Sequence, residues 1–340
     1  MKLGIIGLEG AGKTTLFEAL TGNQQTEAHK SEPRIAVVKV PDSRVDLLSE
    51  MYNPRKTIFA QVDYLLPVRT GGKRDQNAWV AVRDCDAFIH VVRNFTPYGG
   101  DGPQPLRDFT ELDQEMILAD QMVVEKRMER LILDGKRGKP GSPEETALLK
   151  KCLALLESET PLRNDPEIAQ AHLLRGYAFV SGKPVLVLFN NADDDDETPE
   201  KESPALKDIS MTIKGKLEQE IAQMSAEEAE DFLKEFNIQV TARDRVIRRS
   251  YDLLGLISFF TVGEDEVRAW TIRKDTDAVD AAEVIHSDIK KGFIRAEVLS
   301  YEDLMAAGSY AEARKRGTVR LEGKTYKVQD GDIINFRFNV

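Results

Sequence analysis

A glycine-rich segment near the start of the chain combines small residues, a lysine and a threonine at a fixed spacing. It reads Gly7-Leu8-Glu9-Gly10-Ala11-Gly12-Lys13-Thr14. Glycines permit backbone angles that turn successive N–H groups inward, where they can bind the oxygens of a phosphate. Lys13 has the charge to reach the β- and γ-phosphates, and the Thr14 hydroxyl can take one position around Mg²⁺. The segment predicts a triphosphate site with the residues Glu9, Gly10, Ala11, Gly12, Lys13, Thr14 and Thr15.

The elements on either side of this loop have the order that phosphate binding requires. Lys2 to Ile6 is a short apolar strand, and Thr14 to Leu20 has the pattern of a helix. A helix that begins at the loop directs the positive end of its dipole at the phosphates. A chance glycine-rich turn needs neither element, so phosphate binding is the stronger interpretation.

A carboxylate that helps to hold Mg²⁺ is expected at the end of a core strand. The strand-like run Thr57 to Leu65 contains Asp63, which we take as the metal contact together with Thr14. The alternative is an ordinary turn aspartate that follows a strand. The same run could pair with Arg34 to Val40 as an antiparallel hairpin at the edge of the sheet.

A candidate base-reading segment, Asn190-Asn191-Ala192-Asp193, follows the continuous apolar run Pro184 to Phe189. Asn190 can brace the phosphate loop, and Asp193 has the two acceptor oxygens that the N1–H and amino groups of guanine need. Adenine lacks this pair of donors. The alternative is an ordinary turn rich in Asn and Asp. We predict that Asn190, Asn191 and Asp193 bind the nucleotide, and the choice between GTP and ATP stays open.

Composition and charge exclude several classes of protein. The 340 residues, 41% hydrophobic and 31% charged, describe a globular protein with more than one domain. No apolar run approaches the roughly 18 residues of a membrane span, and the start lacks the features of a secretory signal, so we expect a cytoplasmic protein without a membrane partner. A net charge of -11 argues against broad binding to nucleic acid, so that any RNA contact must be local.

Changes of composition divide the chain into three parts. Ala87 to Val92 and Pro184 to Phe189 have the pattern of strands buried on both faces of a parallel sheet. Between them, Leu112 to Leu174 is rich in Leu, Met, Glu, Lys and Arg and predicts an inserted antiparallel helical hairpin. After Phe260, alternating strands surround a helix near 278–287, which indicates a small mixed domain rich in strands.

Several segments spread along the chain match the motifs of a known family. They are Val40-Pro41-Asp42-Ser43-Arg44, Ile117-Leu118-Ala119-Asp120, Phe259 to Gly263, Glu266 to Ile272, Gly292 to Val298, Val328 to Asp332 and Asn335 to Phe338. On these segments the chain resembles the YchF branch of the Obg-like translation-factor GTPases, over nearly its whole length. The resemblance implies an α/β fold with a Ras-like P-loop domain at 1–106 and 178–257, an inserted helical (coiled-coil) domain at 107–177 and a ubiquitin-like β-grasp TGS domain at 258–340. It also implies association with ribosomes and hydrolysis of ATP or GTP.

The switch segments depart from the pattern of that family. The second switch normally carries Asp-x-x-Gly, whereas Asp63-Tyr64-Leu65-Leu66-Pro67 has a leucine at the glycine position, and the loop around Gly71-Gly72 is shortened. In the first switch, His29-Lys30-Ser31-Glu32-Pro33 replaces a motif that bears a threonine, for which Thr26 or Thr57 could substitute.

The base segment departs as well, because it matches neither Asn-Lys-x-Asp nor the Asn-x-x-Glu of the family. We add Thr241 and Ala242 to the predicted nucleotide-binding residues, since their backbone could contact the base.

Together these features predict a regulatory protein that binds Mg-GTP or Mg-ATP, hydrolyses it slowly and contacts ribosomal RNA or protein through its TGS and helical domains. We expect a monomer, and we name no catalytic residue because no residue that positions the attacking water stands out in the sequence. The alternative is a non-hydrolysing interaction scaffold that nucleotide stabilises, which Leu66 and Lys30 favour. A small-molecule kinase is disfavoured by the base segment and the TGS-like tail.

Overall fold

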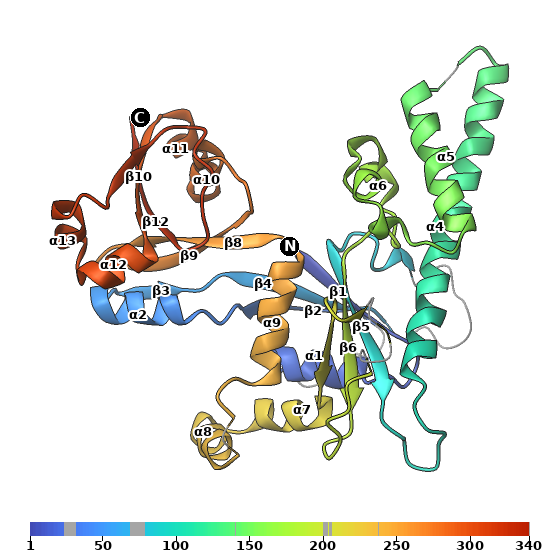
Figure 1. Cartoon of the computed structure of the whole chain (residues 1–340), viewed down its shortest axis with the longest axis horizontal. Coiled ribbons are helices and arrows are strands. Elements are labelled where there is room, and N and C mark those ends of the chain that lie inside the picture. Colours follow the sequence, from blue (N-terminus) through green and yellow to red (C-terminus); the bar gives the residue numbers. More distant parts are fainter. Residues whose placement is uncertain are drawn as a thin grey trace. The chain divides into compact units, whose positions relative to one another are not determined.

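The computed structural model describes residues 1–23, 32–68, 79–139, 141–199, 203, 206–236 and 238–339. The first-switch residues Thr26 and His29 to Ser31 and the glycines Gly71-Gly72 lie outside the described residues. The chain forms two compact units (Figure 1). The first contains Met1–Val37 and Asp63–Val246, and the second contains Val38–Val62 and Ile247–Val340. The predicted domain limits place 38–62 with the nucleotide-binding domain, and these limits stay a prediction.

A six-stranded sheet with the order β2-β4-β1-β5-β6-β7 forms the centre of the first unit. Pairing is parallel between β1 and β4, β1 and β5, β5 and β6, and β6 and β7. All seven residues of β6 are buried, as the continuous apolar run predicts for a strand covered on both faces. The strands are β1 (Lys2–Ile6), β2 (Arg34–Lys39), β4 (Gln61–Leu66), β5 (Ala87–Asn94), β6 (Val185–Asn191) and β7 (Ser210–Ile213).

The helices of the first unit pack around this sheet and extend from it. Figure 1 shows α4 and α5 side by side as the green hairpin that the sequence predicts between β5 and β6. A line of buried side chains, including Val124, Leu149 and Cys152, holds the hairpin together. None of the described helices is long and apolar enough to cross a membrane. The helices are α1 (Lys13–Thr21), α4 (Pro105–Lys136), α5 (Pro143–Glu157), α6 (Pro166–Gln170), α7 (Gly215–Gln223), α8 (Ala226–Glu235) and the 3₁₀ turns Leu162–Asn164 and His172–Tyr177. Helix α9 (Ala242–Leu253) begins in the first unit and ends in the second.

A buried carboxylate anchors the hairpin to the loop that leads back to the sheet. Asp120 of α4 is 1% exposed. Its two oxygens accept hydrogen bonds from the backbone N–H groups of Val180, at 2.9 Å, and Ser181, at 2.7 Å. Burial raises the pKa of Asp120 to about 6, although these hydrogen bonds act in the opposite direction.

We expect this carboxyl group to make stability depend on pH. Between about pH 4 and pH 6 the folded protein holds a proton on Asp120 that the unfolded chain has lost, so the free energy of unfolding should fall as the pH rises through this window. The fall attributable to Asp120 should be on the order of 2 kcal/mol. Urea unfolding of the wild type and of Asp120→Asn across this range measures it. The variant should lack this component, and identical pH slopes in the two proteins would contradict the prediction.

The second unit contains another six-stranded sheet, with the order β11-β10-β12-β8-β9-β3. Antiparallel pairs join β8 to β9 and β10 to β12, and β12 runs parallel to β8. The short strand β3, from the segment between β2 and β4, adds to the edge in parallel with β9, where Thr57 lies opposite Val267. The strands are β3 (Lys56–Ile58), β8 (Leu256–Val262), β9 (Glu266–Arg273), β10 (Phe293–Ser300), β11 (Arg320–Glu322) and β12 (Asp332–Phe338).

Helix α10 packs on this sheet through small side chains. Ala278, Ala281 and Ala282 are fully buried in one cluster with the aromatic rings of Phe259 and Phe336. The close approach of a helix to a mixed sheet agrees with the β domain that the sequence predicts at the C-terminal end. The helices of this unit are α2 (Ser43–Tyr52), α10 (Ala278–Ile285), α11 (Ser287–Lys291), α12 (Tyr301–Ala307) and α13 (Tyr310–Lys315).

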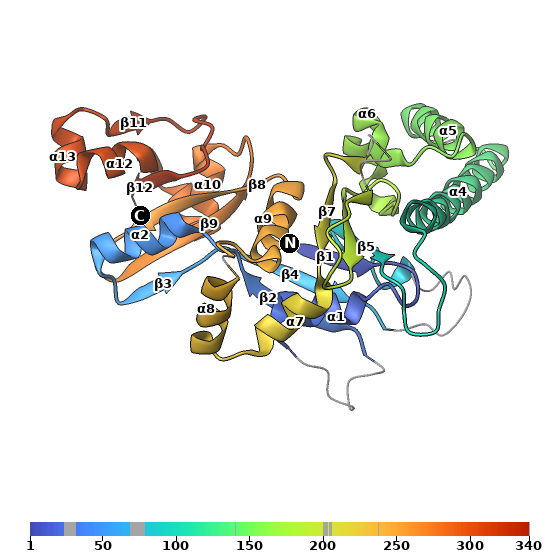
Figure 2. The same ribbon diagram turned by 60° about the horizontal axis from the view of Figure 1, so that its bottom comes forward.

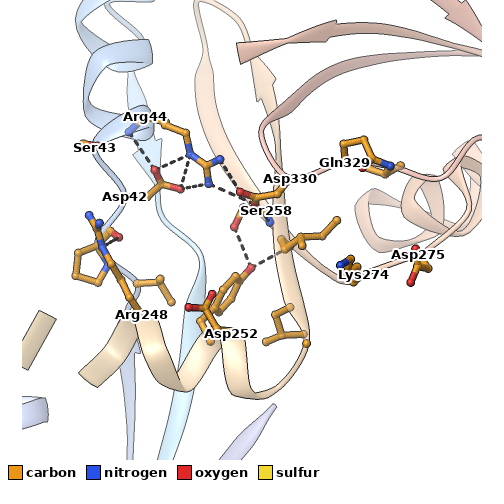
Figure 3. Close-up of a pocket in the computed structure, with 17 residues that line it drawn as sticks. Asp42, Ser43, Arg44, Arg248, Asp252, Ser258, Lys274, Asp275, Gln329 and Asp330 are labelled. Carbon is orange, nitrogen blue, oxygen red and sulfur yellow. Dashed lines mark hydrogen bonds and ion pairs between the residues drawn. The ribbon is translucent and has the colours of Figure 1, made fainter. Parts of the chain in front are cut away.

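A polar hollow of about 610 Å³ lies within the second unit, and Figure 3 shows its lining. The guanidinium of Arg44 stands between two carboxylates, 2.8 Å from Asp42 and 2.7 Å from Asp330. Asp330 also accepts a hydrogen bond from the Ser258 N–H at 2.9 Å. Because both carboxylates already bind the arginine, these contacts join α2 to the C-terminal strands rather than leaving a charge for a ligand.

Candidate nucleotide-binding site

The loop from Gly7 to Lys13 has the backbone geometry of an anion-binding nest. The φ angles of Gly7, Gly10 and Gly12 are 151°, 78° and 94°, in a region that residues with a side chain rarely adopt. Helix α1 begins at Lys13, directly after the loop. Among the described residues no side chain caps its first turn. The start of α1 therefore directs the positive end of the helix dipole at the loop, as phosphate binding requires.

Lys13 folds back over the loop in this structure. Its Nζ donates hydrogen bonds to the carbonyl oxygens of Gly7 and Leu8, both at 2.7 Å. This places the ammonium at the mouth of the nest, where it can exchange these neutral acceptors for charged phosphate oxygens. Charged acceptors form the stronger hydrogen bonds, so a triphosphate should draw Lys13 away from the carbonyls.

The electrostatic field of Lys13 extends into the core beneath the loop. His90 of β5 lies opposite Ile6 and is 1% exposed, with its ring stacked on Phe109 at 5.4 Å. Burial, together with the charges of Arg163 and Lys13, lowers the pKa of His90 to about 3. His90 is therefore neutral and has a structural role at physiological pH, in agreement with its position in a buried strand.

Asn190 at the end of β6 braces the loop as the sequence predicts. Its Nδ2 donates to the carbonyl oxygen of Ala11 at 3.1 Å, and its Oδ1 accepts from the N–H of Gly215 at 3.0 Å. A Cβ atom added to Gly12 would lie 2.2 Å from Asn190 Nδ2. The amide therefore fixes the distance between the phosphate loop and the start of α7. Its part in nucleotide binding stays a prediction.

The other two residues of the base segment lie in different surroundings. Asn191 is buried, and its amide bonds to Asn94 at 3.0 Å and to the carbonyl oxygen of Glu197 at 2.8 Å. These contacts shape the loop after β6, and the part of Asn191 in nucleotide binding stays a prediction. Asp193 lies in an exposed turn two residues further on, where its carboxylate is accessible to a base.

Thr241 and Ala242 lie at the start of α9, and their predicted backbone contact to the base stays a prediction. The N–H of Ala242 donates to the buried carboxylate of Glu218 at 2.9 Å, and the Thr241 hydroxyl accepts from Asp244 N–H at 3.0 Å. Both groups thus cap the start of α9. They are already used within the protein, and neither contacts Asn190 in the described hydrogen bonds.

Sequence reasoning missed the residues that do lie beside Asn190. Strand β7 pairs in parallel with β6, with Ile213 opposite Asn190, and Lys214-Gly215 follow directly at the same edge of the sheet. Lys214 Nζ forms an ion pair with Asp196 at 2.8 Å across this edge. The sequence gives only a weak indication of strand β7, because this strand has four residues and two of them are polar.

The metal prediction for Asp63 is wrong. Strands β1 and β4 are parallel, with Asp63 opposite Lys2 at the start of β1, whereas the phosphate loop follows the other end of β1. Lys2 and Ile6, at the two ends of β1, are four residues apart, which in a strand is about 13 Å. The carboxylate of Asp63 lies 3.9 Å from the N-terminal amine of Met1 instead. The strand continues past Asp63 to Leu66, which the sequence did not show.

Thr14 stands at the second position of α1, where its hydroxyl fits one place in a Mg²⁺ shell. No cluster of three or more His, Cys, Asp or Glu side chains that could hold a metal occurs in the described part of the chain. The Thr14 hydroxyl is therefore the side-chain donor that we assign to the ion on these residues. Phosphate oxygens of the nucleotide and water molecules would have to supply most of the other ligands of the Mg²⁺ ion.

Comparison with known proteins agrees with this geometry. The family YchF-GTPase_C, described as a protein of unknown function (DUF933), matches residues 256–339. The chain is 38% identical over 362 aligned residues to the ribosome-binding ATPase YchF of Bacillus subtilis (strain 168), with 99% of each protein covered. The chain belongs to the YchF family. The ribosome-binding ATPase YchF of Escherichia coli O157:H7 is 35% identical to it and is covered to 99% of its length.

Solved structures extend the likeness to the fold. The YchF GTPase of Schizosaccharomyces pombe superposes with a TM-score of 0.84 at 30% identity and covers 99% of this chain. A GTP-binding protein from Pyrococcus horikoshii OT3, 20% identical, has a TM-score of 0.64 and shares the fold. The predicted α/β fold with a P-loop sheet, a helical insertion and a C-terminal β domain is therefore confirmed, and the chain is an Obg-like nucleotide-binding protein.

Proposed function

We propose that this YchF-family chain is a regulatory protein that binds Mg-ATP or Mg-GTP, associates with ribosomes and hydrolyses its nucleotide slowly. The observation that carries the proposal is the phosphate nest of Gly7 to Lys13, braced by Asn190 and followed at once by α1. The relatives named as ribosome-binding ATPases match this chain over 99% of their length, which supports the ribosomal association. The nucleotide-binding residues in this proposal are Glu9 to Thr15, Asn190, Asp193 and the Lys214-Gly215 pair.

Slow hydrolysis follows from the residues at the loop end of β4. Strands β1 and β4 pair up to Gly4 and Leu65, so the next residue, Leu66, follows at the end of β4 nearer the loop, where a carboxylate linked to Mg²⁺ would be expected. Leu66 is 7% exposed and apolar. Phosphoryl transfer depends on the stabilisation of developing charge and on an oriented water, and Leu66 can supply neither.

This position also favours the second candidate, a scaffold that binds nucleotide without hydrolysis. In that case nucleotide would stabilise the first unit by mass action only. Limited proteolysis separates the two candidates, because a scaffold should show the same protection with a diphosphate and with a nonhydrolysable triphosphate.

Single-turnover hydrolysis of ATP and of GTP, with the protein in excess, tests the proposal. We expect a rate on the order of 10⁻⁴ s⁻¹ or below, comparable to an unassisted GTPase. The rate should vanish in Lys13→Ala and should be unchanged in Asp63→Asn, which removes a carboxylate at the far end of β1. A rate of several per second without a partner would overturn the slow-enzyme proposal.

Calorimetric titration with ADP, ATP, GDP and GTP decides the base preference. If Asp193 reads guanine, GTP should bind more tightly than ATP by roughly tenfold or more, and Asp193→Ala should remove the difference. Equal affinities in the wild type would rule out that role of Asp193. Co-sedimentation with purified ribosomes in each nucleotide state then tests the proposed association.

A further inference from the structure

Helix α8 and the turn that follows it form an outlying segment of the first unit. Figures 1 and 2 both show α8 beyond the end of α7, away from the sheet. A capping box starts the helix, in which Ser225 Oγ accepts from the Glu228 N–H and the Glu228 carboxylate accepts from the Ser225 N–H. None of its ten residues, all of them described, is buried. A helix of this length is marginal in water by itself, so the cap and its apolar contacts must maintain it.

None of the large apolar side chains described in this segment is buried, and those of Phe232, Leu233 and Ile238 are partly exposed. The rings of Phe232 and Phe236 stack at 4.5 Å, one helical turn apart. Phe236 is 59% exposed and Val240 is 48% exposed. A hollow of about 310 Å³ opens beside them, lined in part by Leu233 and Ile238. We call Phe232, Leu233, Phe236, Ile238 and Val240 the α8 patch.

The helix that carries the α8 patch is strongly acidic, and we call its carboxylates the acidic rim. The helix carries five carboxylates, on Glu227, Glu228, Glu230, Asp231 and Glu235. Against them stands one ammonium, that of Lys234, which already pairs with Glu230 at 2.5 Å. This ion pair lowers the pKa of Glu230, and the hydrogen bonds from Ser225 lower that of Glu228, so both groups are ionised at neutral pH. The surface therefore repels polyanions such as RNA and anionic lipid.

An exposed aromatic patch inside a rim of one charge has the composition of a protein-binding surface. We propose that the α8 patch is a docking surface for a basic amphipathic segment of a partner protein, whose apolar side chains cover Phe232 and Phe236 and whose Lys and Arg side chains meet the acidic rim. This deepens and rests on the proposed ribosome association, because a ribosome presents RNA and basic proteins. The acidic rim attracts the basic proteins and repels the RNA.

A second copy of this chain is a poorer occupant. In a symmetric dimer the same patch would face itself, which brings two acidic rims together. The α8 patch therefore favours a different protein of opposite charge over self-association.

A synthetic helical peptide built only of Leu and Lys tests the surface without a ribosome. The peptide should bind the full chain, and a counterpart with Glu in place of Lys should not. Phe236→Ser should weaken binding by about tenfold, the loss typical of an interface aromatic. Tyr98→Ser is the matched control, since Tyr98 is a fully exposed aromatic far along the chain, and it should leave the affinity within about twofold of the wild type.

Charge reversal provides an independent variant. Glu230→Lys with Asp231→Lys should weaken the same peptide by about tenfold or more at low salt and by less at high salt. Asp46→Lys with Glu50→Lys reverses two exposed carboxylates of α2 and should have little effect. Unchanged circular dichroism and nucleotide affinity would show that each variant is folded, as expected for residues that are not buried.

The same proteins are then sedimented with purified ribosomes and photo-crosslinked from position 239, an exposed residue beside the hollow. Crosslinks to ribosomal protein that Phe236→Ser abolishes would support the inference. Crosslinks to RNA, a dimer joined through α8, or equal peptide binding by wild type and Phe236→Ser would overturn it. A wild type that binds the peptide but does not sediment with ribosomes would instead refute the ribosome association in the proposed function.

Discussion

Lys13→Ala is expected to lower the affinity of this chain for nucleoside triphosphate by about a hundredfold or more. The ammonium of the lysine lies at the phosphate nest, 2.7 Å from two loop carbonyls. Charge-assisted hydrogen bonds to phosphate contribute about 1.5 to 3 kcal/mol each, and two such bonds account for a change of this size. The loss should be larger for the triphosphate than for the diphosphate, because only the triphosphate presents γ-phosphate oxygens.

Isothermal titration with both nucleotides, in the presence of Mg²⁺, measures this loss. Lys2→Ala is the matched control, because Lys2 stands on the same strand at the end away from the loop. The control should bind within about twofold of the wild type. If Lys13→Ala binds triphosphate as tightly as Lys2→Ala, the site does not use the lysine and the phosphate nest is not where the nucleotide binds.

The sequence predicted the phosphate loop well because its chemistry is local. The positive φ angles, the lysine and the start of α1 all follow from adjacent residues, and glycine spacing reports them directly. Asn190 was found for a similar reason, since an asparagine directly after a continuous apolar run must lie at the end of a buried strand.

The errors arose where strand pairing decides the outcome. The composition of Thr57 to Leu65 indicates a strand but does not say which residue of β1 lies opposite each position. The observed register places Asp63 at the end of β1 far from the loop, not at the loop end where the carboxylate was expected. Strand β3 presents the same difficulty, because its partner β9 lies about two hundred residues further along the chain. Lys214-Gly215 were missed because a four-residue strand such as β7 gives little periodic signal.

A different loop residue should matter for folding as well as for binding. Gly12→Ala is expected to destabilise the nucleotide-free protein by about 2 to 4 kcal/mol. Part of this cost is the φ of 94°, which a residue with a Cβ atom adopts at an expense of about 1 kcal/mol or more. The rest is steric, since the new Cβ would lie 2.2 Å from Asn190 Nδ2, and that amide is held in place by Ala11 and Gly215.

Gly22→Ala separates these two costs. Gly22 ends α1 with a φ of 70°, and a Cβ atom there meets none of the described atoms within 4 Å, so this variant should lose only the conformational part. Urea unfolding of both variants gives the difference. Adding Asn190→Ala to Gly12→Ala should recover part of the steric cost, because the shorter side chain withdraws the amide, and this non-additivity identifies the contact. If Gly12→Ala is no less stable than Gly22→Ala, or if the two changes at Gly12 and Asn190 simply add, then Asn190 does not hold the phosphate loop in the way that its hydrogen bonds indicate.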